Sequence, residues 1–206
     1  MVPRMAAVRP ADAGEVPALS AALAQAFADE AVMNWLMPQR TRRVARRELM
    51  FTLELQTYVL PQDGMVFTAG VRGSLVGGCL VLPPDRWQMP DAADGRTAVR
   101  WLRAFGVQLS RAIRTKRVLQ EHHPSESHYY IRSVGVGPAL QGQGLGSALM
   151  RPTFERCDSD GVPAYLEASS ERSAALYERL GFVHLGVLEL PDGGPPVWPM
   201  RRPPGG

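Results

Sequence analysis

Apolar residues in the first half of the chain recur at the three- and four-residue spacing of amphipathic helices. Asp12 and Glu15 stand three positions apart, the spacing of a capping box at a helix start. From there apolar residues continue on one face to about Asp29. The same criteria predict a second helix over residues 41–58 and a third from Asp94 to about residue 119.

Shorter apolar runs in this half predict strands. Two of them, over residues 65–72 and 75–82, flank Gly73-Ser74 and read as a hairpin. Residues 5–9 form a further short strand candidate. The first half therefore contributes helices and at least three strands.

The boundaries of helices and strands are clearer in the second half of the chain. Side chains alternate along residues 129–136, a glycine-rich turn then opens a helix to about Asp160, and residues 163–168 form the next strand. Ser170 caps a helix over 171–180 that Gly181 ends. The last strands are expected over 183–190 and 197–201. This order predicts an α/β protein with a mixed central β-sheet of about seven strands flanked by helices.

Composition places the chain among ordinary globular proteins. It has 206 residues, 45% of them hydrophobic, and a net charge of +3. We expect one domain over residues 1–206 in the cytoplasm, because no apolar run is long enough to span a bilayer and no secretory signal opens the chain. The abundance of Ala, Arg, Gly and Pro is typical of bacteria with GC-rich genomes.

The basic residues do not form the dense stripe of a nucleic-acid binder, so no nucleic-acid partner and no membrane partner are expected. The densest run is predicted to be one solvated helix face, and a modest positive field would favour an anionic cofactor. That run consists of Arg40, Arg42, Arg43, Arg46 and Arg47.

Neither cysteines nor histidines have metal-ligand spacing, so no metal site is expected. Cys79 lies in an apolar strand pattern and is expected to be buried. Cys157 lies on a predicted helix, where it could be exposed. His122 and His123 are expected to be loop residues.

The stretch from Val134 to Ser147 holds the most informative motif. A strand feeds a turn with glycines at 142, 144 and 146, and the turn opens a helix, so backbone N–H groups can converge on a phosphate. A Walker A loop would need a Lys here, and a dinucleotide fingerprint would need its third glycine one position later. A tight turn without any ligand remains an alternative for the loop taken alone.

Two motifs together resemble the GCN5-related N-acetyltransferase (GNAT) superfamily. Gln141-x-x-Gly144-x-Gly146 is similar to its cofactor loop, and Leu176-Tyr177-x-x-x-Gly181-Phe182 is similar to its second signature. Within the superfamily, nearly the whole chain resembles the puromycin N-acetyltransferase group. The segments that carry this likeness are 26–29, 133–136, 141–149, 163–169 and 191–198.

The resemblance implies a single GNAT-fold domain with a cofactor-binding core over about residues 128–182. The strands at 129–136 and 163–168 would splay apart, and the pantetheine arm of acetyl-CoA would lie in the gap. Arg172 is a candidate for the nucleotide phosphates, although an exposed helix arginine is equally compatible. The implied cofactor contacts are Val134, Gly135, Val136, Gln141, Gly142, Gln143, Gly144, Leu145, Gly146, Ser147, Ser170, Ser173 and Tyr177. The family often has Asn where Ser170 stands.

The resemblance also assigns catalytic candidates. Tyr177 matches the family's general acid, which protonates the departing thiolate. Glu167 is the first candidate for the base that takes a proton from the amine, and His128 is the second. Each has a structural alternative: a core tyrosine, a buried hydrogen-bond acceptor and a strand-capping histidine.

The implied reaction is direct transfer of an acetyl group from acetyl-CoA to the primary amine of a small molecule, such as an aminonucleoside or antibiotic. A protein or peptide amine acetyltransferase and a non-catalytic acyl-CoA sensor are the alternatives, and a homodimer is left open. Aromatic and acidic side chains would suit a cationic amine. The candidates are Phe27, Glu30, Trp35, Tyr130 and Trp198, with Tyr58 and Trp87 in the same regions.

Overall fold

A mixed eight-stranded sheet is the framework of the computed structural model, which describes residues 7–39, 41–90 and 94–205. Its order is β1-β2-β3-β4-β5-β8-β6, with β7 also paired to β8. The strands are β1 (Ala7–Pro10), β2 (Met65–Val71), β3 (Ser74–Leu82), β4 (Tyr129–Val136), β5 (Ala164–Ala168), β6 (Val183–His184), β7 (Leu188–Glu189) and β8 (Pro196–Arg202). The expected sheet of about seven strands is thus confirmed with one more strand.

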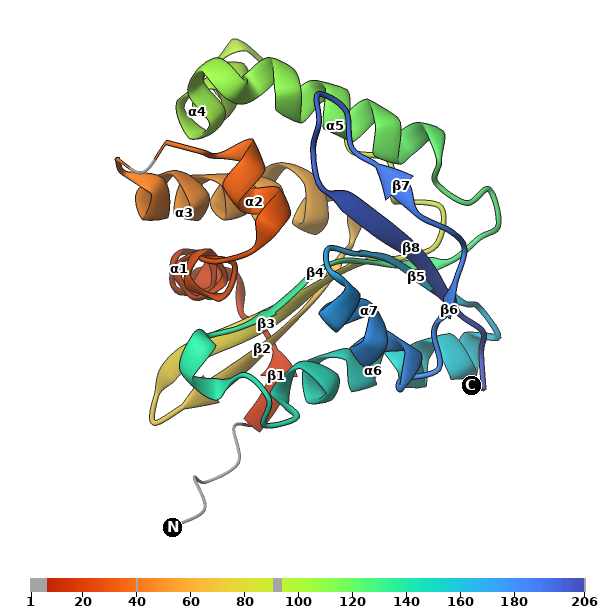
Figure 1. Cartoon of the computed structure of the whole chain (residues 1–206). Coiled ribbons are helices and arrows are strands. Elements are labelled where there is room, and N and C mark those ends of the chain that lie inside the picture. Colours follow the sequence, from red (N-terminus) through yellow and green to blue (C-terminus); the bar gives the residue numbers. More distant parts are fainter. Residues whose placement is uncertain (1–6, 40, 91–93, 206) are drawn as a thin grey trace.

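Helices cover both faces of this sheet (Figure 1). The α-helices are α1 (Val16–Ala26), α2 (Ala31–Leu36), α3 (Arg43–Glu54), α4 (Gly95–Phe105), α5 (Leu109–Glu121), α6 (Leu145–Asp160) and α7 (Glu171–Glu178). Short 3-10 turns are Ala13–Glu15, Leu60–Gln62, Gly106–Gln108 and Pro138–Leu140, and Leu55–Val59 is a π-helical turn. Among the described residues, no helix has the length and apolar character needed to cross a membrane.

The alternation of side chains along β3 divides the core into two layers. Leu80 and Leu82 pack with the cluster formed by α1 and α3, whereas Cys79 and Val81 pack with the cluster under α6 and α7. Figure 1 shows these helix pairs on opposite sides of the sheet. The sheet is therefore packed against an apolar cluster on each of its two faces.

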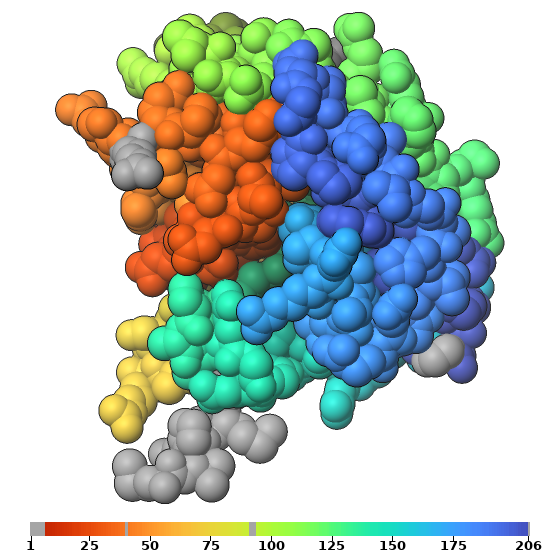
Figure 2. All heavy atoms as spheres, viewed as in Figure 1, coloured from red at the N-terminus to blue at the C-terminus, as the bar shows by residue number. Residues whose placement is uncertain are grey.

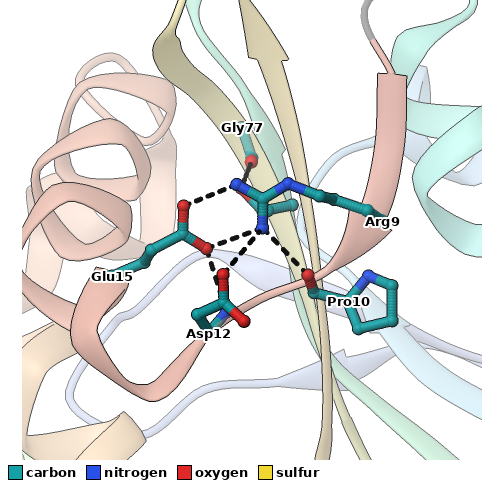
Figure 3. Close-up of polar contacts among 6 residues, drawn as sticks. Arg9, Pro10, Asp12, Glu15 and Gly77 are labelled. Atoms are coloured by element: carbon teal, nitrogen blue, oxygen red, sulfur yellow. Dashed lines mark hydrogen bonds and ion pairs between the residues drawn. The ribbon is translucent and has the colours of Figure 1, made fainter.

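Arg9 joins the first strand to the first helix. Its guanidinium donates to both carboxylate oxygens of Glu15 at 2.8 and 2.6 Å and to the carbonyl oxygen of Pro10 (Figure 3). Glu15 also accepts from the backbone N–H of Asp12 at 2.9 Å, which is the reciprocal half of the expected capping box. This contact holds α1 in place beside the sheet.

Strands β4 and β5 separate after a short parallel start. Their register joins only Tyr129 to Ala164 and Tyr130 to Tyr165. Beyond Tyr130, β4 continues to pair with β3 but has no further ladder with β5 within the described residues. The splay expected between these strands is confirmed, and it opens a gap in the middle of the sheet.

Several helix boundaries differ from the expected ones. The helix expected from Asp94 to residue 119 is two helices, because the chain turns at Gly106, where φ is +58° and a Cβ would lie 2.3 Å from the Arg46 guanidinium. The helix expected over 41–58 ends in the π-helical turn. Gly186, at φ +137°, divides the expected 183–190 strand into β6 and β7. The start of the first expected strand, at residue 5, lies outside the described residues.

The arginine run is a solvated face only in part, since Arg42 is exposed but the other described members are not. Arg47 is only 1% exposed and donates to the carbonyl oxygen of Ala28 and to Asn34 Oδ1, both at 2.8 Å. Arg46 donates to the carbonyl oxygen of Ala104 at 2.9 Å. These arginines join α3 to α2 and α4, so the prediction was wrong for them; Arg40 lies outside the described residues.

Cys157 lies on a helix, α6, as expected, but the side chain is fully buried and not exposed. Burial raises the pKa of its thiol to about 12. Cys79 is buried as expected.

Candidate active site

A cleft of about 790 Å³ opens where β4 and β5 separate. Its walls come from the end of α1 and the start of α2, the loop after β4, the start of α6, and α7. Figure 2 shows this face of the molecule hollowed between those segments. The volume lies in the range that binds a cofactor and a small ligand together.

The loop after β4 forms one end of the cleft. Gly142 and Gly144 have φ of +75° and +78°, and a Cβ at either would meet open space, so the backbone is bare toward solvent. Gln141 Nε2 donates to the carbonyl oxygen of Val136 at 3.1 Å, which fastens the loop to β4. Because α6 begins at Leu145, its first N–H groups face this end. A pyrophosphate would fit such a cradle.

Most of the residues assigned to the cofactor line this cleft. Ser170 also caps α7 by accepting from the Ser173 N–H at 3.1 Å. Gln143 does not line the cleft, and its amide donates to the carbonyl oxygen of Ala139. The lining members of the expected set are Val134, Gly135, Val136, Gln141, Gly142, Gly144, Leu145, Gly146, Ser147, Ser170, Ser173 and Tyr177, together with Arg172.

Tyr177 reaches the cleft from α7 and is 9% exposed. Burial, with a smaller contribution from Cys79, raises the pKa of its phenol, so the hydroxyl stays protonated at neutral pH. Ring contacts with Phe182 at 5.8 Å between centroids hold it in place. Tyr177 is therefore positioned to donate a proton into the cleft.

Glu167 enters the same cleft from β5, and its side chain is 8% exposed. Its Oε2 accepts from the Tyr130 hydroxyl at 2.8 Å. Its Oε1 is buried and has no hydrogen-bond partner among the described residues. An unpaired buried carboxylate oxygen costs about 1–3 kcal/mol, so this atom is an unusual feature of the cleft that calls for an explanation.

Glu54 and Arg132 also line the cleft and were not anticipated. Arg132 Nε lies 2.7 Å from Glu54 Oε1, and the Glu54 side chain is 4% exposed. Burial opposes the charge on Arg132, but Glu54 and the neighbouring phenols raise its pKa well above the usual value. The sequence signal that could have indicated them was a charged residue among apolar ones, Glu54 in a predicted helix and Arg132 in a predicted strand.

His123 is a third residue whose role sequence reasoning missed. Its side chain is 2% exposed and stacks on Trp87, with ring centroids 3.9 Å apart. Its Nδ1 lies 3.7 Å from Glu167 Oε1 and its Nε2 lies 2.9 Å from Nε2 of His128. The expected loop position was correct for the backbone but gave no sign of this burial. No signal in the sequence linked it to Glu167.

The candidates for the acceptor pocket divide into two groups. Phe27 and Glu30 line the cleft, although the Glu30 carboxylate caps α2 by accepting from the N–H groups of Val32 and Met33. Trp35, Tyr130 and Trp198 are not among its lining residues. Trp35 packs under Arg111, with 4.9 Å from guanidinium carbon to ring centroid. Tyr130 lies beneath Glu167 as its hydrogen-bond donor.

Within the described part of the chain, no group of three metal-ligating side chains is assembled. The chemistry of the cleft is that of a phenol donor, a carboxylate acceptor and a backbone phosphate cradle.

Sequence comparison identifies the family. The profile of the Acetyltransferase (GNAT) family matches residues 29–182, and the chain belongs to this family. It is an N-acetyltransferase, and GNAT enzymes use acyl-CoA to acetylate amines.

Individual relatives agree with this assignment. An uncharacterized N-acetyltransferase of Schizosaccharomyces pombe is 28% identical over 200 residues, covering 90% of this chain and 77% of that protein. A crystal structure described as histone acetyltransferase HPA2 and related acetyltransferase from Corynebacterium glutamicum is 28% identical, covers 98% of both chains and has a TM-score of 0.76. The mycothiol acetyltransferase of Paenarthrobacter aurescens is 40% identical over 67 residues, 31% of this chain and 20% of that enzyme.

Proposed function

We propose that this protein transfers an acetyl group from acetyl-CoA to the primary amine of a small molecule, with an aminonucleoside or antibiotic amine of the puromycin type as the first candidate. The observation that carries the proposal is Glu167 Oε1, a buried carboxylate oxygen that accepts no hydrogen bond from the described residues, in the cleft that Tyr177 also lines. A cationic amine supplies the missing donor and the counter-charge.

The residues that would hold acetyl-CoA are the amides from Gln141 to Ser147 at the pyrophosphate and the free edge of β4 beside the pantetheine arm. Bound there, acetyl-CoA supplies the thioester whose acyl group is transferred. Glu167 would take the proton that the ammonium loses at Oε1, which leaves a neutral amine able to attack. Tyr177 would give its hydroxyl proton to the sulfur that leaves, and the second proton lost by the attacking nitrogen would restore the Tyr177 hydroxyl. The protein itself forms no covalent bond in this scheme.

The shape of the cleft favours a small acceptor. Thr115 and Leu119 of α5 line it, and so do Leu190 and Val197 near β7 and β8. The volume of about 790 Å³ must accommodate the pantetheine arm and the acceptor together. A protein amine remains the second candidate, because the 28%-identical crystal structure is described as a histone acetyltransferase.

A screen of acceptor amines that reports free thiol tests the proposal. Puromycin, other small primary amines and a lysine-containing peptide should be offered with acetyl-CoA. Thiol release with small amines is expected, and Glu167→Gln should lower kcat by about 100-fold or more while leaving coenzyme A binding unchanged. Thiol release with the peptide alone would indicate a protein acetyltransferase. Thermal stabilisation by acetyl-CoA with no turnover would indicate a sensor, and its absence would refute the cofactor assignment.

A further inference from the structure

Behind Glu167 lies a pair of buried histidines that the chemistry above does not use. His123 comes from the segment after α5, and His128 stands directly before β4. Both rings are enclosed by aromatic side chains, with Tyr165 edge-on to His123 at 4.7 Å and to His128 at 5.2 Å between centroids. His128 is 2% exposed. Such an aromatic enclosure fixes the orientation of both rings.

Hydrogen-bond partners determine which nitrogens carry protons. His128 Nδ1 lies 2.6 Å from the carbonyl oxygen of Glu126, which can only accept, so Nδ1 carries the hydrogen. When both rings are neutral, His128 Nε2 is then an acceptor, and His123 Nε2 must donate to it across 2.9 Å. His123 Nδ1 is therefore left with a lone pair, and this lone pair faces Glu167.

The result is two acceptor atoms that face each other. His123 Nδ1 and Glu167 Oε1 are 3.7 Å apart, and neither has a hydrogen to share in this state. A proton that arrives on Glu167 Oε1 would convert the pair into a donor and an acceptor. The arrangement is complementary to a protonated Glu167, the form that follows deprotonation of the amine.

We propose that His123 and His128 are a proton relay behind Glu167, in which His123 accepts the proton that Glu167 takes from the acceptor amine and passes another to His128. The proposal rests on the proposed function. The N–H bond of the ammonium breaks as Glu167 Oε1–H forms. That O–H then breaks as His123 Nδ1–H forms, while the Nε2–H of His123 breaks and that of His128 forms. One positive charge has then moved from the amine to His128.

The residues around the two histidine rings favour both the uptake of the proton and its later release. Burial lowers the pKa of His128, which keeps the ring neutral and ready to accept before each turnover. The groups that face the two rings are Glu126, Tyr130, Tyr165, Glu167 and Trp87. Glu126 favours the charged ring through its carbonyl and its carboxylate, and that carboxylate is 55% exposed, so the relay leads toward solvent. His123 and His128 are positioning residues, since both act through Glu167.

Histidine NMR on the wild-type protein tests the resting state directly. With 15N-labelled histidine at neutral pH, His123 should be the neutral Nε2–H tautomer and His128 the neutral Nδ1–H tautomer. The chain has four histidines, so His122→Asn and His184→Asn variants assign the other two signals. A neutral Nδ1–H tautomer or an imidazolium at His123 would overturn the proposal.

Kinetics on two variants test the transfer. His123→Phe keeps a ring to stack on Trp87, and His123→Asn keeps a donor for His128; neither can relay a proton. With an amine that the wild type acetylates, kcat should fall by about tenfold or more near pH 7, and the defect should shrink as pH rises toward the pKa of the amine. The KM for acetyl-CoA should stay within about twofold. His122→Phe, at the exposed neighbouring position, should match the wild type.

A folded His123 variant with wild-type kcat and an unchanged pH profile would refute the relay while leaving the proposed function intact. If the wild type acetylates no amine at all, the proposed function itself fails. A variant that loses kcat equally at every pH indicates a structural role and also contradicts the relay. If neither variant folds, the tautomers measured in the wild type decide the question.

Discussion

At the scale of single residues, buried polar atoms distinguish function from packing. Tyr177 and Tyr130 are both buried phenols whose pKa burial raises. Tyr130 donates to Glu167, whereas Tyr177 has no hydrogen-bond partner among the described residues and lines the cleft. A buried phenol that keeps its proton without an internal acceptor is available to a ligand. The two tyrosines are therefore distinguished by their hydrogen-bond partners more than by residue type.

Replacing Tyr177 by Phe should lower kcat by about 100-fold or more, because the departing sulfur loses its proton donor. Affinity for coenzyme A should change little, since the pyrophosphate cradle is formed by backbone atoms. Isothermal calorimetry and thiol release measure the two quantities. Tyr129→Phe, which removes a buried phenol that donates to Asp160 and does not line the cleft, is the matched comparison. An unchanged kcat in Tyr177→Phe would remove this residue from the mechanism.

Arg47 shows how much stability one buried side chain can contribute. Arg47→Met should destabilise the fold by about 2 kcal/mol, because the carbonyl of Ala28 and Oδ1 of Asn34 lose charged donors. The midpoint of thermal unfolding should fall by about 4–8 °C. Arg103→Met, at an exposed position of α4, should shift it by less than about 2 °C. Equal shifts would contradict the role of Arg47 as a buried connection.

At the scale of elements, α6 has a left-handed residue at each end and uses them differently. Gly144 precedes its first turn at φ +78° and lines the cleft, whereas Gly161 follows its last turn at φ +68°. A Cβ would meet open space at either glycine. The backbone strain of a side chain is thus similar at both ends, about 1–2 kcal/mol. Only the Gly144 end lines the cleft, where the cofactor is proposed to bind.

These two glycines provide a matched pair of variants. Gly144→Ala and Gly161→Ala should lower the unfolding midpoint by comparable amounts. Gly144→Ala should also weaken coenzyme A binding by about tenfold or more, because its methyl group would occupy space reserved for the pyrophosphate. Titration calorimetry with coenzyme A provides the readout. Equal affinities in the two variants would contradict the placement of the cradle.

At the scale of the whole molecule, ion pairs fasten the last strand to distant elements. Arg202 of β8 is paired with Asp158 of α6 at 2.8 Å, and Arg201 is paired with Glu126 before β4 at 2.8 Å. The hydrogen bond from Arg202 lowers the pKa of Asp158, and that from Arg201 lowers the pKa of Glu126. Because β8 borders the cleft through Val197, these pairs also support the site.

These ion pairs predict that the stability of the protein decreases at acidic pH. A carboxyl whose pKa is depressed by folding contributes stability above its unfolded pKa and loses it as pH falls through the folded value. Asp158→Asn should therefore lower the unfolding midpoint by about 2–4 °C at pH 7, after allowance for solvent screening, and the gap should close below about pH 3.8. Glu155→Gln, an exposed carboxyl on α6, should show no such gap. A gap independent of pH would contradict an ionic origin.

The sequence by itself determined the features that depend on neighbours along the chain. Residues 129–136 form the strand expected of them, Ser170 caps α7, and Gly181 ends that segment at φ +88°. The phosphate-binding loop and the family signature were visible for the same reason. Periodicity, caps and glycine turns are local properties, so local patterns predict them.

Only the tertiary structure decided which distant groups meet. His123 beside Glu167, Glu54 beside Arg132 and the burial of Arg47 all depend on contacts between separate elements of the fold. No spacing in the chain encodes these contacts, because each arises from packing between elements that are remote in sequence. The loop proposed to bind the cofactor is therefore predictable from local sequence, whereas the environment of Glu167, the proposed base, is a property of the folded molecule.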